Sequence, residues 1–232
     1  MTRLQAVLFD LDDTLIDSSG IEARVWLDVV ELIAARYPDA DRGLLRERYV
    51  AALESHYADH AAGVTDFLTY RRARLAEALE PWGAVDDELF GRYVEIKDRC
   101  IHAVEPAEGA LEVVRRLRAR GACVGILTNG PGWMQRRKLE VSGVGDTVDA
   151  IAISGEIGAA KPDGAAFAAA LGLLGTTAAE TAMIGDSLVN DVQGALAAGF
   201  ASVVWLNDGG EPAPGAAAAA TLAEVPRILG LA

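Results

Sequence analysis

Cysteines and basic residues are scarce in this chain of 232 residues. The two cysteines, Cys100 and Cys123, belong to no CxxC or CxxxxC pair, which argues against a disulfide framework or a zinc site and favours a reducing compartment. Lys and Arg number 21 against 34 Asp and Glu, a net charge of −13. A field of that sign repels nucleic acids and anionic membranes, so we expect neither as a partner.

Long apolar runs are also missing. The apolar segment after Met1 ends at Phe9, which is too short for a signal peptide or a membrane span and predicts a cytoplasmic protein. Apolar residues nevertheless make up 51% of the sequence, enough for a sizeable core. The sequence leaves open whether the chain is a monomer or a homodimer.

Five short apolar segments have the pattern of strands buried on both faces of a parallel sheet. They occupy residues 4–9, 122–127, 150–153, 181–184 and 201–206. Segments with helical periodicity follow or separate them, at residues 112–120, 133–142, 164–174 and 189–198. This alternation predicts an α/β fold with a Rossmann-like parallel sheet.

A long stretch without a convincing strand separates the first two strand segments, and a simple crossover does not account for it. We expect a helical cap domain there, at residues 17–105, inserted into a core built from 1–16 and 106–232. Residues 207–220, rich in Gly, Pro and Ala, read as a surface linker before a last short helix.

Residues suited to capping four helix starts support this reading of the insert. Ser19 and Glu22 have the spacing of a capping box, in which each side chain accepts a bond from the other's backbone amide. Three further positions are expected to cap helices: Asp41, Thr65 and Asp86.

Polar residues follow the predicted strands at their carboxyl ends, where an open parallel sheet gathers side chains into one crevice. They come from four separate segments of the chain: Asp10, Asp12 and Thr14; Thr128 and Asn129; Lys161; and Asp186, Ser187 and Asp191. Each segment alone has an ordinary interpretation as a turn or a helix cap. The four together, in this order, predict a functional site.

The chemistry of this set fits a phosphate site built around a cation. Carboxylates packed into one cleft repel one another and a phosphate dianion unless a cation compensates them. The candidate ligands are hard oxygens, which favours Mg²⁺ over zinc. Lys161 supplies a second positive charge, and Thr128 with its glycine-containing turn supplies donors to phosphate oxygens.

The two-residue spacing of Asp10 and Asp12 suggests separate roles for two neighbouring carboxylates. Asp10 would accept the phosphoryl group as an aspartyl phosphate. Asp12 would protonate the leaving alkoxide and then activate water. The sequence thus predicts a phosphomonoester hydrolase with a small phosphorylated metabolite as substrate.

These four segments resemble the motifs of the haloacid dehalogenase-like hydrolase superfamily, in the subfamily with a helical C1 cap after the first strand. They read FDLDDTL, LTNG, KPD and GDSLVND, and the resemblance covers nearly the whole chain. The stretches QRRKL, SGEIG and VWLN are most similar to the nucleotidase and acylneuraminate-phosphatase branch.

The resemblance implies roles for individual residues. It makes Asp10 the nucleophile and Asp12 the acid and base, and it places three residues on the phosphate: Thr128, Asn129 and Lys161. Magnesium would be held by Asp10, the backbone carbonyl of Asp12, and Asp186. Asp191 would ligate through water or orient Lys161, and Ser187 and Thr14 would support these groups.

Several rival functions belong to the same or another class. A halide leaves unprotonated, and the dehalogenases of the superfamily lack the carboxylate that Asp12 supplies, so a 2-haloacid dehalogenase is disfavoured. A phosphomutase shares the aspartyl phosphate and remains open, although its relatives have glycine in place of Asp13. A non-catalytic binding module predicts missing motif residues, and none is missing. A dinucleotide-dependent oxidoreductase would need GxGxxG after the first strand.

Overall fold

The computed structural model describes residues 4–61, 65–207 and 209–231. Their contacts divide the chain into two compact units. The first unit joins Met1–Ser19 to Ala103–Ala232, and the second is Gly20–His102. The chain therefore leaves the first unit after its first strand, forms the second unit, and returns to the first unit at Ala103.

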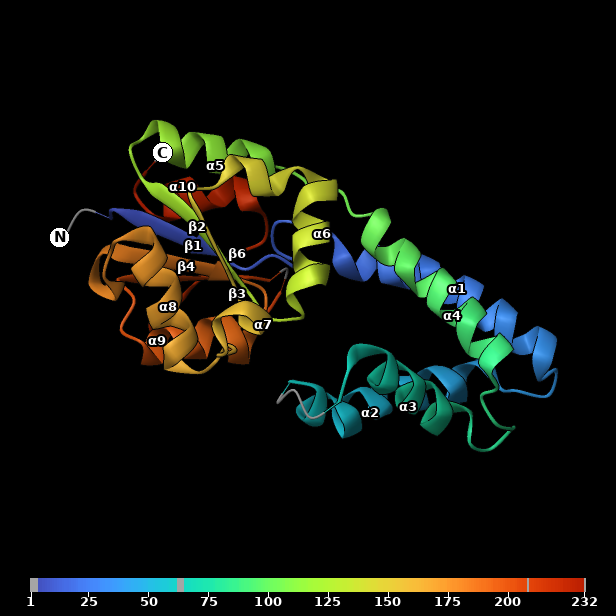
Figure 1. The fold of residues 1–232 in the computed structure, drawn as a ribbon. Coiled ribbons are helices and arrows are strands. Elements are labelled where there is room, and N and C mark those ends of the chain that lie inside the picture. The colour runs from blue at the N-terminus through green and yellow to red at the C-terminus, as the bar shows by residue number, and fades with distance from the viewer. Residues whose placement is uncertain (1–3, 62–64, 208, 232) are drawn as a thin grey trace. The chain divides into compact units, whose positions relative to one another are not determined.

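The first unit is built on a parallel sheet of six strands in the order β3-β2-β1-β4-β5-β6 (Figure 1). The strands are β1 (Ala6–Phe9), β2 (Cys123–Thr128), β3 (Ala150–Ile153), β4 (Thr181–Gly185), β5 (Ser202–Leu206) and β6 (Ala217–Ala219). Every residue of β1 is buried, as expected for a central strand covered on both faces. The predicted α/β class and parallel sheet are confirmed.

The edge strand β6 was not expected. Residues 207–220 were predicted to be a linker, but Ala217–Ala219 pairs with β5 in register with Val204, Trp205 and Leu206. A run of alanines has low strand propensity, so the sequence gives no local signal for it. Pairing with the free edge of β5 supplies the backbone hydrogen bonds that decide its conformation.

Helices cover both faces of the sheet: α5 and α10 lie on one side, and α8 and α9 on the other (Figure 1). Their bounds are α5 (Ala110–Ala119), α6 (Gly132–Ser142), α7 (Ser154–Ile157), α8 (Gly164–Leu174), α9 (Gly194–Ala197) and α10 (Val225–Ile228). Short 3-10 turns are η1 (Val144–Thr147), η2 (Ala178–Glu180) and η4 (Leu222–Glu224), whereas η3 (Leu188–Gln193) is a π-helical turn. The helix expected at 189–198 therefore begins with a wider turn than an α-helix has.

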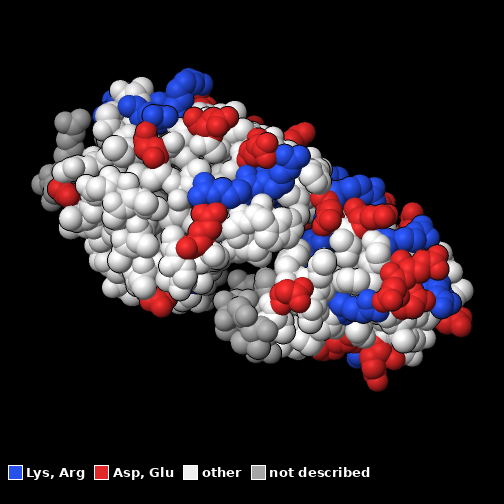
Figure 2. All heavy atoms as spheres, in the orientation of Figure 1, with Lys and Arg blue, Asp and Glu red and all other residues white. Residues whose placement is uncertain are grey.

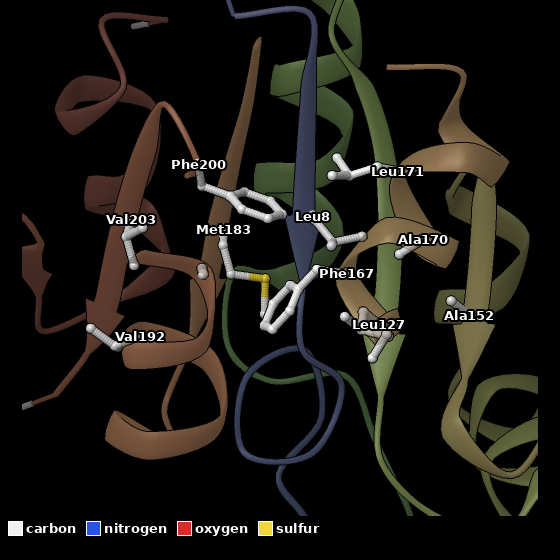
Figure 3. Close-up of a cluster of buried hydrophobic side chains, with 12 residues drawn as sticks. Leu8, Leu127, Ala152, Phe167, Ala170, Leu171, Met183, Val192, Phe200 and Val203 are labelled. Carbon is white, nitrogen blue, oxygen red and sulfur yellow. The ribbon is translucent and has the colours of Figure 1, made fainter. Parts of the chain in front are cut away.

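One hydrophobic cluster lies between the sheet and α8 (Figure 3). Leu8, Leu127 and Met183 point from three neighbouring strands towards Phe167 of α8. Phe167 packs edge to face against Phe200, with ring centroids 5.5 Å apart. Burial of each such large side chain contributes about 1.5–3 kcal/mol, so this cluster fixes α8 and the loop before it on the sheet.

The second unit is a set of four helices, α1 (Ser18–Arg36), α2 (Arg42–Ala61), α3 (Phe67–Leu79) and α4 (Asp87–His102). The first two residues of α1 belong to the first unit. The core of the second unit contains Trp26, Leu75 and a buried pair of tyrosines, Tyr49 and Tyr93, whose hydroxyl oxygens are 2.5 Å apart.

Two of the expected helix caps are confirmed in this unit. Asp41 accepts a hydrogen bond from the Leu44 amide at 2.7 Å, and Asp86 accepts one from the Leu89 amide at 2.8 Å. The expectation for Thr65 is wrong, because the next residue, Asp66, is the N-cap of α3. An aspartate carboxylate at that position accepts two backbone amides.

The expected capping box at Ser19 and Glu22 is also wrong. The Ser19 hydroxyl donates to the Asp13 carboxylate at 2.5 Å, and Glu22 forms an ion pair with Lys97 at 2.9 Å. Charged partners brought near by the fold bind these side chains more strongly than the neutral backbone amides of the helix start would.

Acidic and basic side chains are interspersed on the face shown in Figure 2. Ion pairs near the surface of the first unit include Arg118 with Asp149 and Arg136 with Glu156. Within residues 4–61, 65–207 and 209–231, no helix combines the length and the apolar character that crossing a bilayer requires.

A glycine at the end of β4 provides a test of how tightly the first unit is packed. A Cβ atom at Gly185 would lie 2.3 Å from Oδ2 of Asp191 and 2.6 Å from its Cβ. We expect Gly185→Ala to lower the free energy of unfolding by about 1–3 kcal/mol, because the fully buried Asp191 has no room to move. Urea denaturation measures this change.

Gly172 of α8 is the matched control, because nothing lies within 4 Å of a Cβ atom built there. Gly172→Ala should raise the free energy of unfolding by about 0.5–1 kcal/mol, since alanine loses less backbone entropy in a helix. If both variants moved in the same direction, the proposed crowding at Gly185 would be refuted.

Candidate active site

The polar segments singled out in the sequence lie along the carboxyl edge of the sheet. Asp10 directly follows β1, Thr128 ends β2, and Asp186 directly follows β4. Because β2, β1 and β4 are neighbours in the sheet, these three positions are adjacent in space. Lys161 reaches the same place from the loop between α7 and α8.

Lys161 is the centre of a buried ion network. Its Nζ lies 2.6 Å from Oδ1 of Asp10 and 2.6 Å from Oδ1 of Asp191. The second oxygen of Asp191 accepts a hydrogen bond from the Ser187 amide at 3.0 Å. Asn129 fixes the backbone of Lys161 by donating to its carbonyl and accepting from its amide, each at 2.9 Å. Both oxygens of Asp191 are therefore occupied in holding other groups.

The pKa values in this network show how strongly burial acts. Burial raises the pKa of Asp10 to about 8 against the attraction of Lys161, and the negative charge of Asp191 adds to the rise. Burial acts to lower the pKa of Lys161, but the two carboxylates outweigh it and raise that pKa above its ordinary value. Lys161 therefore carries a charged ammonium group. The carboxyl of Asp10 lies beside it, and burial disfavours the ionised form of that carboxyl.

Three carboxylates form a group that could hold a metal ion. Asp10, Asp186 and Asp191 each place one oxygen within 4.8 Å of the others. Burial raises the pKa of Asp186 to about 6, with further rises from Asp191 and Asp13. The donors are hard carboxylate oxygens, which are the ligands that Mg²⁺ prefers.

Asp12 stands apart from that carboxylate group and is bound instead by α6. Its Oδ1 accepts a hydrogen bond from Nζ of Lys138 at 2.6 Å and one from the Ser18 hydroxyl, and its Oδ2 accepts one from Nε2 of Gln135 at 2.8 Å. Burial acts to raise the pKa of Asp12, but Lys138 and the three hydrogen bonds lower it below its ordinary value. Sequence reasoning identified Asp12 but not Gln135 or Lys138.

The remaining predicted residues support this edge of the sheet. The buried Thr128 accepts a hydrogen bond at Oγ1 from Gln135 at 2.5 Å. Thr14 donates to Asp186 at 3.3 Å, while the Ser187 hydroxyl accepts the Asn190 amide at 3.2 Å and does not contact the carboxylate group. The Asp186 carbonyl accepts a bond from the indole of Trp205 at 2.7 Å, a contact that the sequence did not indicate.

A cavity of about 750 Å³ opens beside this edge within the first unit. Asp186 and Thr14 lie on its wall, together with Trp205 and Asn207 from the end of β5 and the loop after it. The carboxylate group is therefore accessible from solvent on the side of Asp186, although Asp10 and Lys161 are buried.

The sequence of this chain matches a known family and several of its characterised members. A family model of haloacid dehalogenase-like hydrolases matches residues 4–199. N-acylneuraminate-9-phosphatase from Homo sapiens is 30% identical over 215 residues, which cover 90% of this chain and 85% of the relative. Phosphoserine phosphatase from Thermus thermophilus is 32% identical over 232 residues, which cover 90% and 91% of the two chains.

Solved structures have the same fold. A HAD phosphatase from Thermococcus onnurineus is 26% identical, with a TM-score of 0.71 and 98% of each chain covered. The magnesium-bound HAD-hydrolase YfnB from Bacillus subtilis is 24% identical, with a TM-score of 0.74, covering 98% of this chain and 99% of that one.

The raised pKa of Asp186 predicts that the carboxylate group has a pH-dependent cost to stability when a chelator keeps metal ions away. A carboxyl whose pKa rises on folding contributes stability below its ordinary pKa, and this is lost as pH rises through about 6. With EDTA present, Asp186→Asn should therefore raise the free energy of unfolding at about pH 8 by roughly 1 kcal/mol, a figure reduced for solvent screening.

Denaturation with urea at two pH values measures this effect. The advantage of Asp186→Asn should shrink at about pH 5, where the wild-type carboxyl is mostly protonated. Added Mg²⁺ should stabilise the wild type more than the variant, because the variant lacks a ligand. A variant less stable than the wild type at the higher pH in EDTA would contradict the crowding of these carboxylates.

Proposed function

Because the chain belongs to the haloacid dehalogenase-like hydrolase family, we propose that Asp10 is its nucleophile and Asp12 its acid and base. The protein is a phosphatase of small phosphorylated metabolites. The observation that carries the assignment of residues is the meeting of Asp10, Asp186 and Lys161 at one edge of the sheet.

In the first step, a carboxylate oxygen of Asp10 attacks the phosphorus atom of the substrate. The bond from phosphorus to the ester oxygen breaks, and its electron pair remains on the leaving oxygen, which takes a proton from Asp12. Lys161, Thr128 and Asn129 hold the phosphoryl oxygens during this transfer. Lys161 is suited to that task because Asp191 and Asn129 fix both its charge and its backbone.

In the second step, a water molecule attacks the phosphorus of the aspartyl phosphate. Asp12 accepts the proton of that water, the bond from phosphorus to Asp10 breaks, and orthophosphate leaves with the carboxylate restored. Lys138 favours the ionised form of Asp12 that this second step uses, whereas the first step uses the minor protonated form.

Magnesium fits the donor set of the site. Asp10, Asp186 and the backbone carbonyl of Asp12 would hold it, while Asp191 orients Lys161, as its two occupied oxygens indicate. When bound, the ion supplies positive charge that offsets the negative charge of the phosphoryl group and of the carboxylates. A phosphatase is favoured over a dehalogenase because Asp12 is present and anchored, and only an alkoxide leaving group needs its proton.

The substrate is a phosphomonoester whose identity a screen would reveal. The curated relatives are named for different substrates, among them N-acylneuraminate 9-phosphate, phosphoserine and pyrimidine nucleotides. Phosphate release should be measured over nucleoside monophosphates, sugar phosphates, phosphoserine and phosphoglycolate, with Mg²⁺ present. The Asp10→Asn protein serves as the blank.

Removing the nucleophile tests the assignment of Asp10. Asp10→Asn should lower kcat at least about a thousandfold on any substrate found, because an amide cannot form the aspartyl phosphate. The fold should persist, since the buried position tolerates a neutral group of the same shape. The matched control is Asp146→Asn at an exposed position of η1, which should keep its activity. Substantial turnover by Asp10→Asn would disprove the assignment.

Metal removal tests the carboxylate group. Phosphate release should stop in EDTA and return on addition of excess Mg²⁺, because Asp10 and Asp186 cannot hold a phosphate dianion nearby without a cation. Circular dichroism before and after chelation separates loss of activity from loss of fold. Full activity in EDTA would contradict the proposed cofactor.

A further inference from the structure

Two side chains of α6 point at the same carboxylate. Gln135 and Lys138 are three residues apart, so they lie on one face of the helix. Nε2 of Gln135 is 2.8 Å from Oδ2 of Asp12, and Nζ of Lys138 is 2.6 Å from Oδ1. Together with the Ser18 hydroxyl on Oδ1, they engage both oxygens, so the carboxylate cannot rotate without breaking a charged hydrogen bond.

Gln135 joins Asp12 to the segment proposed to bind phosphate. Its side chain is buried, with 1% of the residue exposed, and Nε2 also lies 2.5 Å from Oγ1 of Thr128 and 3.2 Å from the Asn129 carbonyl. One amide group thus contacts the carboxylate of Asp12 and the hydroxyl of Thr128. In a phosphomonoester, the leaving oxygen is one bond away from the phosphorus. The distance between the Asp12 carboxylate and the Thr128 hydroxyl therefore decides whether Asp12 can reach the leaving oxygen while Thr128 holds the phosphoryl group.

Lys138 contributes its charge at the same point. Its side chain is largely buried, at 14% exposure, and among the residues that the structure describes Asp12 is the one carboxylate within 4 Å of it. The neighbouring basic residues of α6 behave differently: Arg136 pairs with Glu156 and Arg137 with Glu140, both at exposed positions. An apolar side chain would fill this largely buried position at a lower desolvation cost than Lys138, so packing alone does not explain the lysine.

We propose that Gln135 and Lys138 are positioning residues that orient the Asp12 carboxylate for proton transfer at the leaving oxygen. The inference rests on the proposed function and assigns these residues no contact with substrate. Without them, Asp12 would sample several rotamers, and the fraction aligned with the leaving oxygen would fall.

The dependence of rate on the leaving group separates this role from a merely structural one. Benzyl phosphate expels an alkoxide that needs a proton, whereas 4-nitrophenyl phosphate, of similar shape, expels a stable anion that does not. Lys138→Met should lower kcat/KM for benzyl phosphate roughly 10- to 100-fold and for 4-nitrophenyl phosphate by less than about threefold. KM should change little for either ester, and Lys138→Arg should recover part of the lost rate.

Two further variants complete the test. Gln135→Leu should lower the rate for both esters, because it also loses the contact with Thr128, but the rate for benzyl phosphate by more. Arg137→Met, which removes a charge from the exposed side of α6, should lower neither. Circular dichroism and thermal melting confirm that each variant is folded. If Lys138→Met is unfolded, Lys138→Gln takes its place, since it also removes the charge but keeps a polar group beside the Asp12 carboxylate.

The outcomes distinguish the two proposals. Equal losses on both esters, or no loss on either, would overturn the positioning role while leaving the phosphatase assignment intact. Retained turnover by Asp10→Asn would overturn the nucleophile assignment instead. A wild-type enzyme that released phosphate from no phosphomonoester of the screen, these two esters included, would overturn both proposals.

Discussion

The buried ammonium group of Lys161 is the interaction on which the site depends. It lies between Asp10 and Asp191, and without it two carboxylates would face each other in a region closed to solvent. Removing Lys161 would leave two buried carboxylates without a compensating charge, which costs about 3–5 kcal/mol. The sheet makes this arrangement possible, since β1 and β4 are neighbours and both end at this point. The ion network of Lys161 therefore determines both the stability of this part of the core and the geometry of the site.

Asp10 and Asp12 are two residues apart, yet their surroundings move their pKa values in opposite directions. Burial raises the pKa of Asp10 to about 8, whereas Lys138 and its neighbours lower that of Asp12. A nucleophile must be ionised, so Asp10, which already has Lys161 beside it, needs a further cation before it can act at neutral pH. Because their environments differ, two carboxylates in one loop can perform different chemical roles.

Sequence patterns predicted the parts of the fold that burial determines. Strands β1 to β5 are apolar because they are covered on both faces, and their order with the helices indicated a parallel sheet. The edge strand Ala217–Ala219 carries no such signal, because its conformation is set by pairing with β5. Within the site, residues that end strands could be found from their position. Gln135 and Lys138 could not, because polar residues in an amphipathic helix are indistinguishable from its solvent face until the packing of that helix is known.

The π-helical turn at Leu188–Gln193 bears on how this part of the chain can change during evolution. Such a turn contains about one residue more than an α-helical turn, and π-turns are frequent at functional sites. Removing that residue would allow an ordinary helix and would satisfy the local backbone, but it would rotate Asp191 by roughly a quarter of a turn away from Lys161. A deletion here would therefore cost the ion pair with a lysine thirty positions earlier in the chain, so the length of this segment matters to charge pairing more than to helix formation.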